Sequence, residues 1–571
     1  MFFIAFAADY DGTLADNGVV NEATIAALER VRRSRRRSIL VTGRRLDDLQ
    51  QVFSRLELFD RVIAENGAVL YRPADKKMEI LAEPPPAAFI AALRARGVTP
   101  LAIGKAIVAS SEPQQDAVLE AINDLGLELQ IVFNKGAVMV LPAGINKASG
   151  LLTALRDLAL SPINSVAVGD GENDHALLRA CGCAVAVANA VPALRDAADW
   201  VTPGRCGAGV VELIEGLLRD DLASVTRCHD RHKIILGQRD GAALALSAIG
   251  NCRILVSGAS ASGKSTFTAG FLERLTAAGL QYCIVDPEGD YDGIEFAVSV
   301  GDAQRSPSVS KIVELLDRPI QNVAINLLGV AVQDRPNFLV ALLAALLQLR
   351  ERTGRPHWIV INEAHHMLPQ EELETAAAPF AANLGQMMFI TVHPDHLARS
   401  VLASVDWLVA LGKAVKDTMR SFAAAARIML PEKLPDPPAP GRAMVWHVAS
   451  GDPPVEIAIV PPKGERLRHI RKYAVGELAR DKSFYFRGPQ NKLNLRAQNL
   501  ETFCQLLEGV DEVTWRHHLA SGDYSRWLRE CIKDMELADE VAAVEANADE
   551  EAGDSRGKIR AAIENRYTRT P

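Results

Sequence analysis

Two carboxylates follow the first apolar segment of the chain. Residues 2–8 (FFIAFAA) predict a buried strand, and Asp9 and Asp11 come directly after it. Side chains two positions apart on an extended chain point to the same side. One carboxylate of such a pair can attack phosphorus while the other protonates the leaving oxygen. The spacing therefore predicts phosphoryl-transfer chemistry at the end of this strand.

Three further segments place polar groups where they suit the same chemistry. The strand SILV ends at Thr42, whose hydroxyl can hold a phosphoryl oxygen, and Lys147 in GINKASGL can neutralise developing negative charge. The strand SVAV is followed by Asp170 and Asp174. Carboxylate oxygens are the ligands that Mg²⁺ prefers, so this last pair predicts a magnesium site.

These four segments, in this order, resemble the haloacid-dehalogenase (HAD) phosphatase superfamily over residues 1–217. The resemblance implies that Asp9 is the nucleophile, which forms an aspartyl-phosphate, and that Asp11 is the general acid and base. It implies that Thr42 and Lys147 bind the phosphoryl group. It also implies a metal set, in which Mg²⁺ is held by Asp9, the Asp11 carbonyl and Asp170, with Asp174 supporting the site.

An insertion separates the second and third motifs. Residues 72–143 predict a helix, a strand, a second helix and two strands. This α/β pattern resembles the cap of the HAD subgroup that hydrolyses sugar phosphates and phosphoglycolate, and so does the stretch GCAVAVANA (182–190). A cap excludes water and selects small substrates. The expected substrate is a small phosphorylated metabolite.

A second constellation predicts a nucleotide-binding loop. The strand CRILVS leads into the pattern GxxxxGK[ST], formed by Gly258, Gly263, Lys264 and Ser265, and then into Thr266 and a helix. Glycines let backbone N–H groups wrap phosphates, the lysine reaches the β and γ oxygens, and the serine ligates Mg²⁺. ATP with Mg²⁺ is the expected ligand.

Downstream, the apolar strand HWIVI ends at Asn362 and Glu363. An acid pair at this place activates water in ATPases. Together with IVDPEGDY (284–291), INEAHHMLP and the hairpin before the loop, it resembles the HerA/FtsK-type ATPase superfamily over residues 230–462. The resemblance implies that Glu363 polarises the attacking water. The chain departs from the pattern at Asn362, where the family has a carboxylate, so slow hydrolysis or nucleotide sensing without turnover stays open.

Histidines cluster around the same predicted strands. The strand MMFITV presents Thr391 or His393 as a sensor of the γ-phosphate. His365 and His366 begin a helix, and adjacent side chains on a helix point in different directions. Capping or packing is therefore the favoured interpretation of this pair, ahead of metal binding.

Length and composition set the frame for these sites. The 571 residues predict about three to five domains. The expected architecture is α/β: a HAD Rossmann-like domain with an α/β cap, a P-loop NTPase domain with a parallel sheet, and a small, mainly helical domain at 466–571. The 8 cysteines are scattered, which predicts reduced thiols and a cytoplasmic protein. The longest apolar run is too short to span a bilayer, so no membrane partner is expected.

The leading hypothesis is a Mg²⁺-dependent phosphatase joined to an ATP-binding module that regulates it or assembles a homo-oligomer. One alternative is a nucleic-acid end-processing phosphatase, and another is a DNA-translocating ATPase with an auxiliary phosphatase. The 63 basic against 71 acidic residues give a net charge of −8 and argue against a general attraction to nucleic acid, although a local basic patch stays open. A signalling scaffold with two relic sites is the non-enzymatic alternative.

Overall fold

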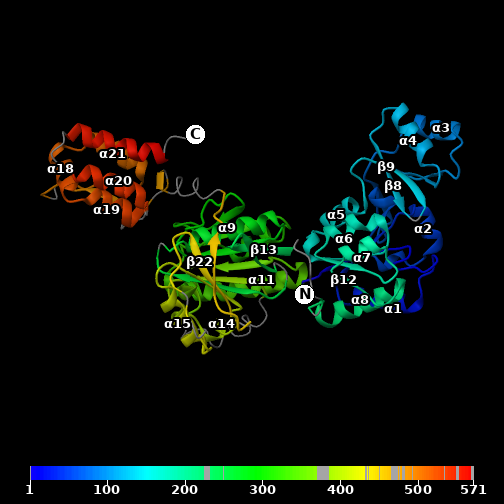
Figure 1. Cartoon of the computed structure of the whole chain (residues 1–571), viewed down its shortest axis with the longest axis horizontal. Coiled ribbons are helices and arrows are strands. Elements are labelled where there is room, and N and C mark those ends of the chain that lie inside the picture. Colours follow the sequence, from blue (N-terminus) through cyan, green and yellow to red (C-terminus); the bar gives the residue numbers. More distant parts are fainter. Residues whose placement is uncertain are drawn as a thin grey trace. The chain divides into compact units, whose positions relative to one another are not determined.

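The chain is described from a computed structural model (Figure 1). It covers residues 2–567, apart from 135, 224, 226–231, 248–249, 261, 370–384, 431–433, 435, 449, 464–472, 475, 477, 479–481, 491–492, 533 and 548–551. Two compact units are distinguished: residues 1–258 with 272–458, and residues 259–271 with 459–571. No helix among the described residues is long and apolar enough to cross a membrane.

The amino-terminal part of the first unit is a twisted sheet of eight described strands. In sheet order the strands are β12 (Trp200–Val201), β11 (Cys183–Ala186), β10 (Ser165–Gly169), β1 (Ala5–Asp9), β2 (Arg37–Val41), β3 (Arg61–Ala64), β4 (Val69–Arg72) and β5 (Lys77–Ile80). The first six run parallel, and β4 and β5 add an antiparallel edge. This arrangement confirms the α/β class predicted for this part of the chain.

Helices cover both faces of this sheet, which explains why β1 is apolar from Ala5 to Ala8. Phe6 and Ala8 pack in one cluster with residues of α1 (Glu22–Arg33) and α8 (Cys206–Asp220). Ala5 and Ala7 pack in another cluster, on the opposite face, with α5 (Lys147–Asp157), α6 (His175–Ala180) and α7 (Pro192–Ala197). A strand buried on both faces needs a continuous apolar run, so the polar residue Asp9 comes at its end.

The cap is a separate small α/β layer (Figure 1, upper blue and cyan elements). Its sheet has the order β6 (Ala102–Ile103), β7 (Val108–Ser111), β9 (Ala137–Pro142) and β8 (Leu129–Asn134), and it packs with α3 (Ala87–Ala95) and α4 (Gln115–Asp124). The sequence predicts that the cap insertion begins at residue 72. In the structure β5 still belongs to the main sheet, because it pairs in register with β4, and the cap elements begin with α3.

The rest of the first unit contains a larger sheet of eleven described strands. The order is β14 (Ala242–Ser247), β13 (Lys233–Arg239), β23 (Val455–Ile459), β22 (Arg442–His447), β21 (Trp407–Leu411), β15 (Arg253–Gly258), β20 (Met387–Thr391), β19 (Trp358–Ile361), β16 (Tyr282–Asp286), β18 (Asn322–Asn326) and β17 (Ala297–Val300). Its helices are α10 (Val309–Leu316), α11 (Arg335–Thr353), α12 (Ala364–Met367), α14 (Arg399–Leu402) and α15 (Val415–Ala426). Helix α9 (Lys264–Ala277) is divided between the units, because its residues up to 271 belong to the second unit. The strands from β17 to β21 run parallel, and antiparallel pairs, with the predicted hairpin β13–β14, close one end.

Buried polar contacts join the two sheets inside this unit. His357 Nε2 lies 3.0 Å from Asn164 Oδ1, and Asn164 Nδ2 donates to the carbonyl of Gly354 over 3.3 Å. The fully buried Arg355 donates to the carbonyl of Ala159 over 3.0 Å. Because Asn164 directly precedes β10, these contacts lie at the amino ends of the first sheet's strands, away from its carboxylates.

The carboxy-terminal part of the second unit is mainly helical. Its elements are β24 (Phe484–Phe486), β25 (Leu495–Ala497), α17 (Leu500–Gly509), α18 (Glu512–Ala520), α19 (Asp523–Trp527), α20 (Met535–Glu545) and α21 (Ala552–Tyr567). Trp515 and Trp527 are buried in its apolar cluster. The predicted start at residue 466 lies outside the described residues.

Candidate active site

Three aspartates meet at the carboxyl edge of the first sheet. Asp9 ends β1, while Asp170 and Asp174 follow the adjacent parallel strand β10. Their carboxylate oxygens lie within 4.8 Å of one another, and all three side chains are buried. The local turn is fixed by Asp174, whose Oδ2 accepts the backbone N–H groups of Asp170 (3.0 Å) and Gly171 (2.9 Å).

Lys147 supplies a buried positive charge to this cluster. It is the first residue of α5, whose start is fixed by an Asn146 capping box. Its Nζ lies 2.6 Å from Asp9 Oδ1 and 2.7 Å from Asp174 Oδ1, and the residue is 2% exposed. Three carboxylates against one ammonium leave an excess of negative charge when all are ionised, so the donor set fits a divalent cation.

Burial and the neighbouring charges shift the pKa values of both Asp9 and Lys147. Desolvation raises the pKa of Asp9 to about 7; the nearby Asp174 and Asp170 add to this, while Lys147 opposes it. Burial alone would lower the pKa of Lys147, but the carboxylates of Asp174 and Asp9 raise it above its ordinary value. The lysine is therefore a permanent cation, and it favours the ionised form of the group beside it.

Asp11 is not part of this cluster of side chains. It accepts two hydrogen bonds from Arg44, at 2.7 Å from Nε and 2.6 Å from Nη2, and the guanidinium also lies over the Tyr10 ring. Arg44 is tied to the second motif, because its backbone N–H donates to Thr42 Oγ1 over 3.1 Å. Thr42 itself is fully buried directly after β2. The first two motifs are thus joined through Arg44.

The third strand contributes a loop that the sequence analysis did not single out. Glu65 and Asn66 follow β3 with positive φ angles of 52° and 53°. The next residue, Gly67, has φ 110°, and a Cβ atom there would lie 1.9 Å from the carbonyl oxygen of Asn146. Only glycine allows this approach. The loop therefore fixes the start of the helix that carries Lys147.

This loop also binds the cap. The Glu65 carboxylate accepts N–H groups of three successive cap residues, Lys105, Ala106 and Ile107, at 2.9, 2.9 and 3.2 Å. Charge-assisted bonds of this kind are stronger than neutral ones. They hold one loop of the cap against the carboxyl edge of the main sheet.

Three asparagines lie between the cap and the main sheet. Asn173 Nδ2 donates to Asn66 Oδ1 over 2.8 Å, and the Asn134 side chain, from cap strand β8, lies against Gly171. The Oδ1 atoms of Asn134 and Asn173 are buried without a hydrogen-bond partner. Buried acceptors of this kind are costly unless a ligand or water satisfies them.

One more residue supports the aspartates. Asn189 Nδ2 lies 3.2 Å from Asp170 Oδ2 and 2.8 Å from the carbonyl of Gly12, and its Oδ1 accepts the N–H of Cys206. Thr13 Oγ1 donates to Asp170 Oδ1 over 3.3 Å. Asn189 lies in the stretch GCAVAVANA, so the resemblance noted for that stretch was the available signal.

The glycine-rich loop has the predicted strand and helix on either side. β15 ends at Gly258 and α9 begins at Lys264, with Ser265 and Thr266 in its first turn. Gly263 has φ 97°, and Lys264 Nζ donates to the carbonyl of Ala259 over 3.0 Å. In this conformation the lysine folds back over its own loop.

Asn362 and Glu363 lie two strands away from β15. Asn362 and Glu363 follow β19, and β20 runs between β19 and β15. Glu363 has φ 46°, a strained value for this residue type, and its Oε2 lies 3.4 Å from His365 Nδ1. Asn362 Nδ2 donates to Asp286 Oδ1 over 3.1 Å, so an acid from the neighbouring strand β16 stands beside the amide.

Known proteins are similar to the part of the chain that contains the first of these sites. Residues 6–87 and 99–214 match the profile of the haloacid dehalogenase-like hydrolases. A phosphoglycolate phosphatase of Methanothermobacter thermautotrophicus is 30% identical over 222 residues, which cover 37% of this chain and 96% of that protein. One of Natronomonas pharaonis is 32% identical over 165 residues, 27% of this chain and 72% of that protein. The chain belongs to the haloacid dehalogenase-like hydrolase family through its amino-terminal part.

A solved haloacid dehalogenase-like hydrolase from Bacteroides thetaiotaomicron aligns with 37% of this chain and 98% of its own length, at 19% identity and a TM-score of 0.33.

Proposed function

We propose that the amino-terminal part is a Mg²⁺-dependent phosphatase of a small phosphorylated metabolite, such as a sugar phosphate or phosphoglycolate. The observation that carries this proposal is the buried ion-pair cluster, in which Lys147 Nζ lies within 2.7 Å of both Asp9 and Asp174. An ammonium in this position favours the ionised form of a buried carboxylate, which is the form that attacks phosphorus.

In the proposed reaction an Asp9 oxygen attacks phosphorus, and the bond from phosphorus to the ester oxygen breaks. Asp11 gives its proton to the leaving alcohol. A water molecule then attacks the aspartyl-phosphate and gives its proton to Asp11, which releases phosphate and restores Asp9. Arg44 holds the Asp11 carboxylate by two bonds in the present arrangement and has to release it for these proton transfers. Thr42 and Lys147 bind the transferred group.

Asp9, Asp170 and the Asp11 carbonyl would hold the Mg²⁺, with Asp174 orienting Asp170 through the turn. When bound, the ion neutralises charge on the phosphoryl oxygens. Asn189 and Thr13 each donate a hydrogen bond to one oxygen of the Asp170 carboxylate. Such supporting bonds orient metal ligands.

The cap favours a small substrate over a polymer. Glu65 holds the cap loop against the sheet edge, and the buried acceptors Asn134 and Asn173 lie at the same junction. We infer that the Oδ1 atoms of these two amides accept hydrogen bonds from substrate hydroxyl groups, which a sugar phosphate has and ionised phosphoglycolate lacks. The relatives are named phosphoglycolate phosphatases, which supports a small organic phosphate as the substrate.

The test is phosphate release from sugar phosphates, phosphoglycolate and a 3′-phosphorylated oligonucleotide, with Mg²⁺ or with EDTA. Asp9→Asn keeps the shape of the side chain and should lower kcat on the order of 10⁴-fold or more. Asp16→Asn, an exposed change seven residues along the chain, is the matched control. Activity confined to the oligonucleotide, or equal in Asp9→Asn and the control, would overturn the proposal.

We propose a second activity, ATP binding with slow hydrolysis, for the region around the glycine-rich loop. By the resemblance of the sequence pattern, Lys264, Ser265 and Thr266 would bind ATP·Mg²⁺, and Glu363 would polarise water. The arrangement at Asn362 supports turnover, because Asp286 places a carboxylate 3.1 Å from the amide. Asp286 would then provide the negative charge that Asn362 lacks.

This second proposal is tested by ATP binding and hydrolysis in Lys264→Ala and Asp286→Asn. Lys264→Ala should lose ATP affinity and keep phosphatase activity, while Asp286→Asn should keep ATP affinity and lose turnover. Asp292→Asn, six residues after Asp286, is the control for Asp286→Asn. Full hydrolysis in Asp286→Asn would contradict the assigned role, and unchanged binding in Lys264→Ala would contradict the nucleotide site.

A further inference from the structure

A short 3-10 turn brings two histidines together after β20. The turn η7 (Pro394–His396) has His393 at its N-cap, and the N–H of His396 bonds to the carbonyl of His393 over 3.2 Å. Side chains three residues apart are eclipsed in a 3-10 turn. The two imidazoles are therefore stacked, with ring centroids 4.8 Å apart and planes at 23°.

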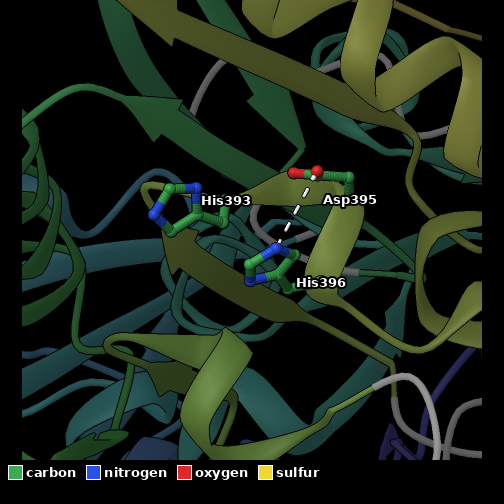
Figure 2. Close-up of side chains that lie close together, drawn as sticks. All are labelled: His393, Asp395 and His396. Atoms are coloured by element: carbon green, nitrogen blue, oxygen red, sulfur yellow. Dashed lines mark ion pairs between the residues drawn. The ribbon is translucent and has the colours of Figure 1, made fainter.

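Asp395 completes a group of three potential ligands. Its Oδ2 lies 4.0 Å from His396 Nε2, and one ligand atom from each of His393, Asp395 and His396 falls within 4.8 Å of the others (Figure 2). The side chains of Asp395 and His396 are 53% and 61% exposed. They have the rotamer freedom to close further around an ion, and solvent can supply the remaining ligands.

We propose that His393, Asp395 and His396 form a binding site for a divalent transition metal, with Zn²⁺ as the expected ion. Two imidazoles and one carboxylate are a ligand set found at three-ligand zinc sites, in which water takes the fourth position. Ligands around tetrahedral zinc are about 3.4 Å apart, as follows from metal–nitrogen distances of about 2.1 Å. The ligand atoms lie within 4.8 Å of one another, so they need to approach by at most about 1.4 Å, which the freedom of exposed side chains allows.

The chemistry of the donors separates this site from the aspartate cluster. Imidazole nitrogen prefers Zn²⁺, Ni²⁺, Co²⁺ and Cu²⁺, whereas an all-carboxylate set prefers Mg²⁺. The edge of the His365 ring meets His393 at 5.6 Å and 82°, and His365 Nδ1 lies 3.1 Å from Thr391 Oγ1. His365 thus packs against the site and helps to orient His393.

The experiment measures Co²⁺ and Zn²⁺ binding to the full chain without a histidine tag. An Asp170→Asn background weakens the aspartate cluster, and Co²⁺ gives a visible spectrum when imidazoles bind it. His393→Asn and His396→Asn are compared with the parent and with His517→Asn, a histidine of the helical region, as the matched control.

We expect one equivalent of Co²⁺ with this spectrum, displaced by Zn²⁺, and a loss of affinity of roughly tenfold or more in each of the two site variants. The control should bind like the parent. Equal affinity in His393→Asn, His396→Asn and the parent would overturn the proposal, and so would the absence of an imidazole-type cobalt spectrum in the parent.

Discussion

Removing the charge of Lys147 is the sharpest test of the first site's electrostatics. Lys147→Met keeps an unbranched chain of similar length but deletes the ammonium. It leaves Asp9 and Asp174, which are 4% and 0% exposed, without the cation that lies 2.6 and 2.7 Å from their oxygens. Asp170 stands in the same cluster and adds a further negative charge.

The expected cost is large. Breaking a buried ion pair by removing one partner costs about 3–5 kcal/mol, since the other partner stays buried and uncompensated. Total stabilities of about 5–15 kcal/mol make this a substantial fraction. Asp174→Asn in the same chain removes one of the repelling charges and keeps an oxygen for the two N–H groups that it accepts. The double variant should recover about 1–3 kcal/mol.

Hydrogen exchange in urea, followed on peptides that cover β1 and β10, measures the free energy of unfolding of this part of the chain separately from the rest. Lys77→Met, an exposed lysine on β5, is the control and should stay within about 0.5 kcal/mol of the parent. In EDTA the Lys147→Met protein should show its full loss. A saturating divalent ion at 100 times its Kd should return about 2.7 kcal/mol.

The reasoning is refuted if, in EDTA, the free energy of unfolding of Lys147→Met lies within about 1 kcal/mol of the parent's, because an ordinary substitution has an effect of this size. It is also refuted if Asp174→Asn further destabilises the Lys147→Met protein. Either result would mean that the carboxylates do not depend on the lysine for their buried charge.

Three further predictions concern other parts of the molecule. Burial, with help from two neighbouring arginines, lowers the pKa of His357 to about 3. Below pH 6.5 His357 takes up a proton in the unfolded chain but stays neutral in the folded chain. The free energy of unfolding therefore decreases as the pH is lowered, by about 2 kcal/mol at pH 5. Denaturant unfolding should show this loss in the parent and not in His357→Gln; equal losses would contradict it. Asn189→Ala releases Asp170 and should raise the Mg²⁺ concentration for half-maximal phosphatase activity about tenfold, a shift that a titration would reveal or exclude. Gly67→Ala meets the Asn146 carbonyl and should destabilise this domain by about 3 kcal/mol or more, so an unchanged Tm would count against the described loop.

The sequence predicted the strands of the first site well for a physical reason. A strand buried on both faces has to be apolar throughout, so a carboxylate such as Asp9 or Asp170 marks its end clearly. Parallel strands bring those ends to one edge, and β1 and β10 are indeed neighbours. The prediction needed only local pattern and the rule that orders parallel α/β units.

The supporting contacts were not predictable in the same way. Asn189 and Gly12 are 177 residues apart, and the Glu65 bonds to the cap join segments about forty residues apart. No local period marks such a pair. The ENG sequence after β3 did carry a signal, because polar residues after an apolar strand lie at the same edge as Asp9.

At position 362 the chain has an amide where the expected pattern has a carboxylate, and the structure places another carboxylate, Asp286, beside it. A carboxylate at 362 would stand beside the buried Asp286, whose pKa burial has already raised to about 6. Two adjacent buried carboxylates repel, whereas an amide donates its N–H to one. Asn362 does so over 3.1 Å, across 76 residues of sequence. The acid missing after β19 therefore has a counterpart at the end of β16, and the amide is the partner that allows Asp286 to be buried there.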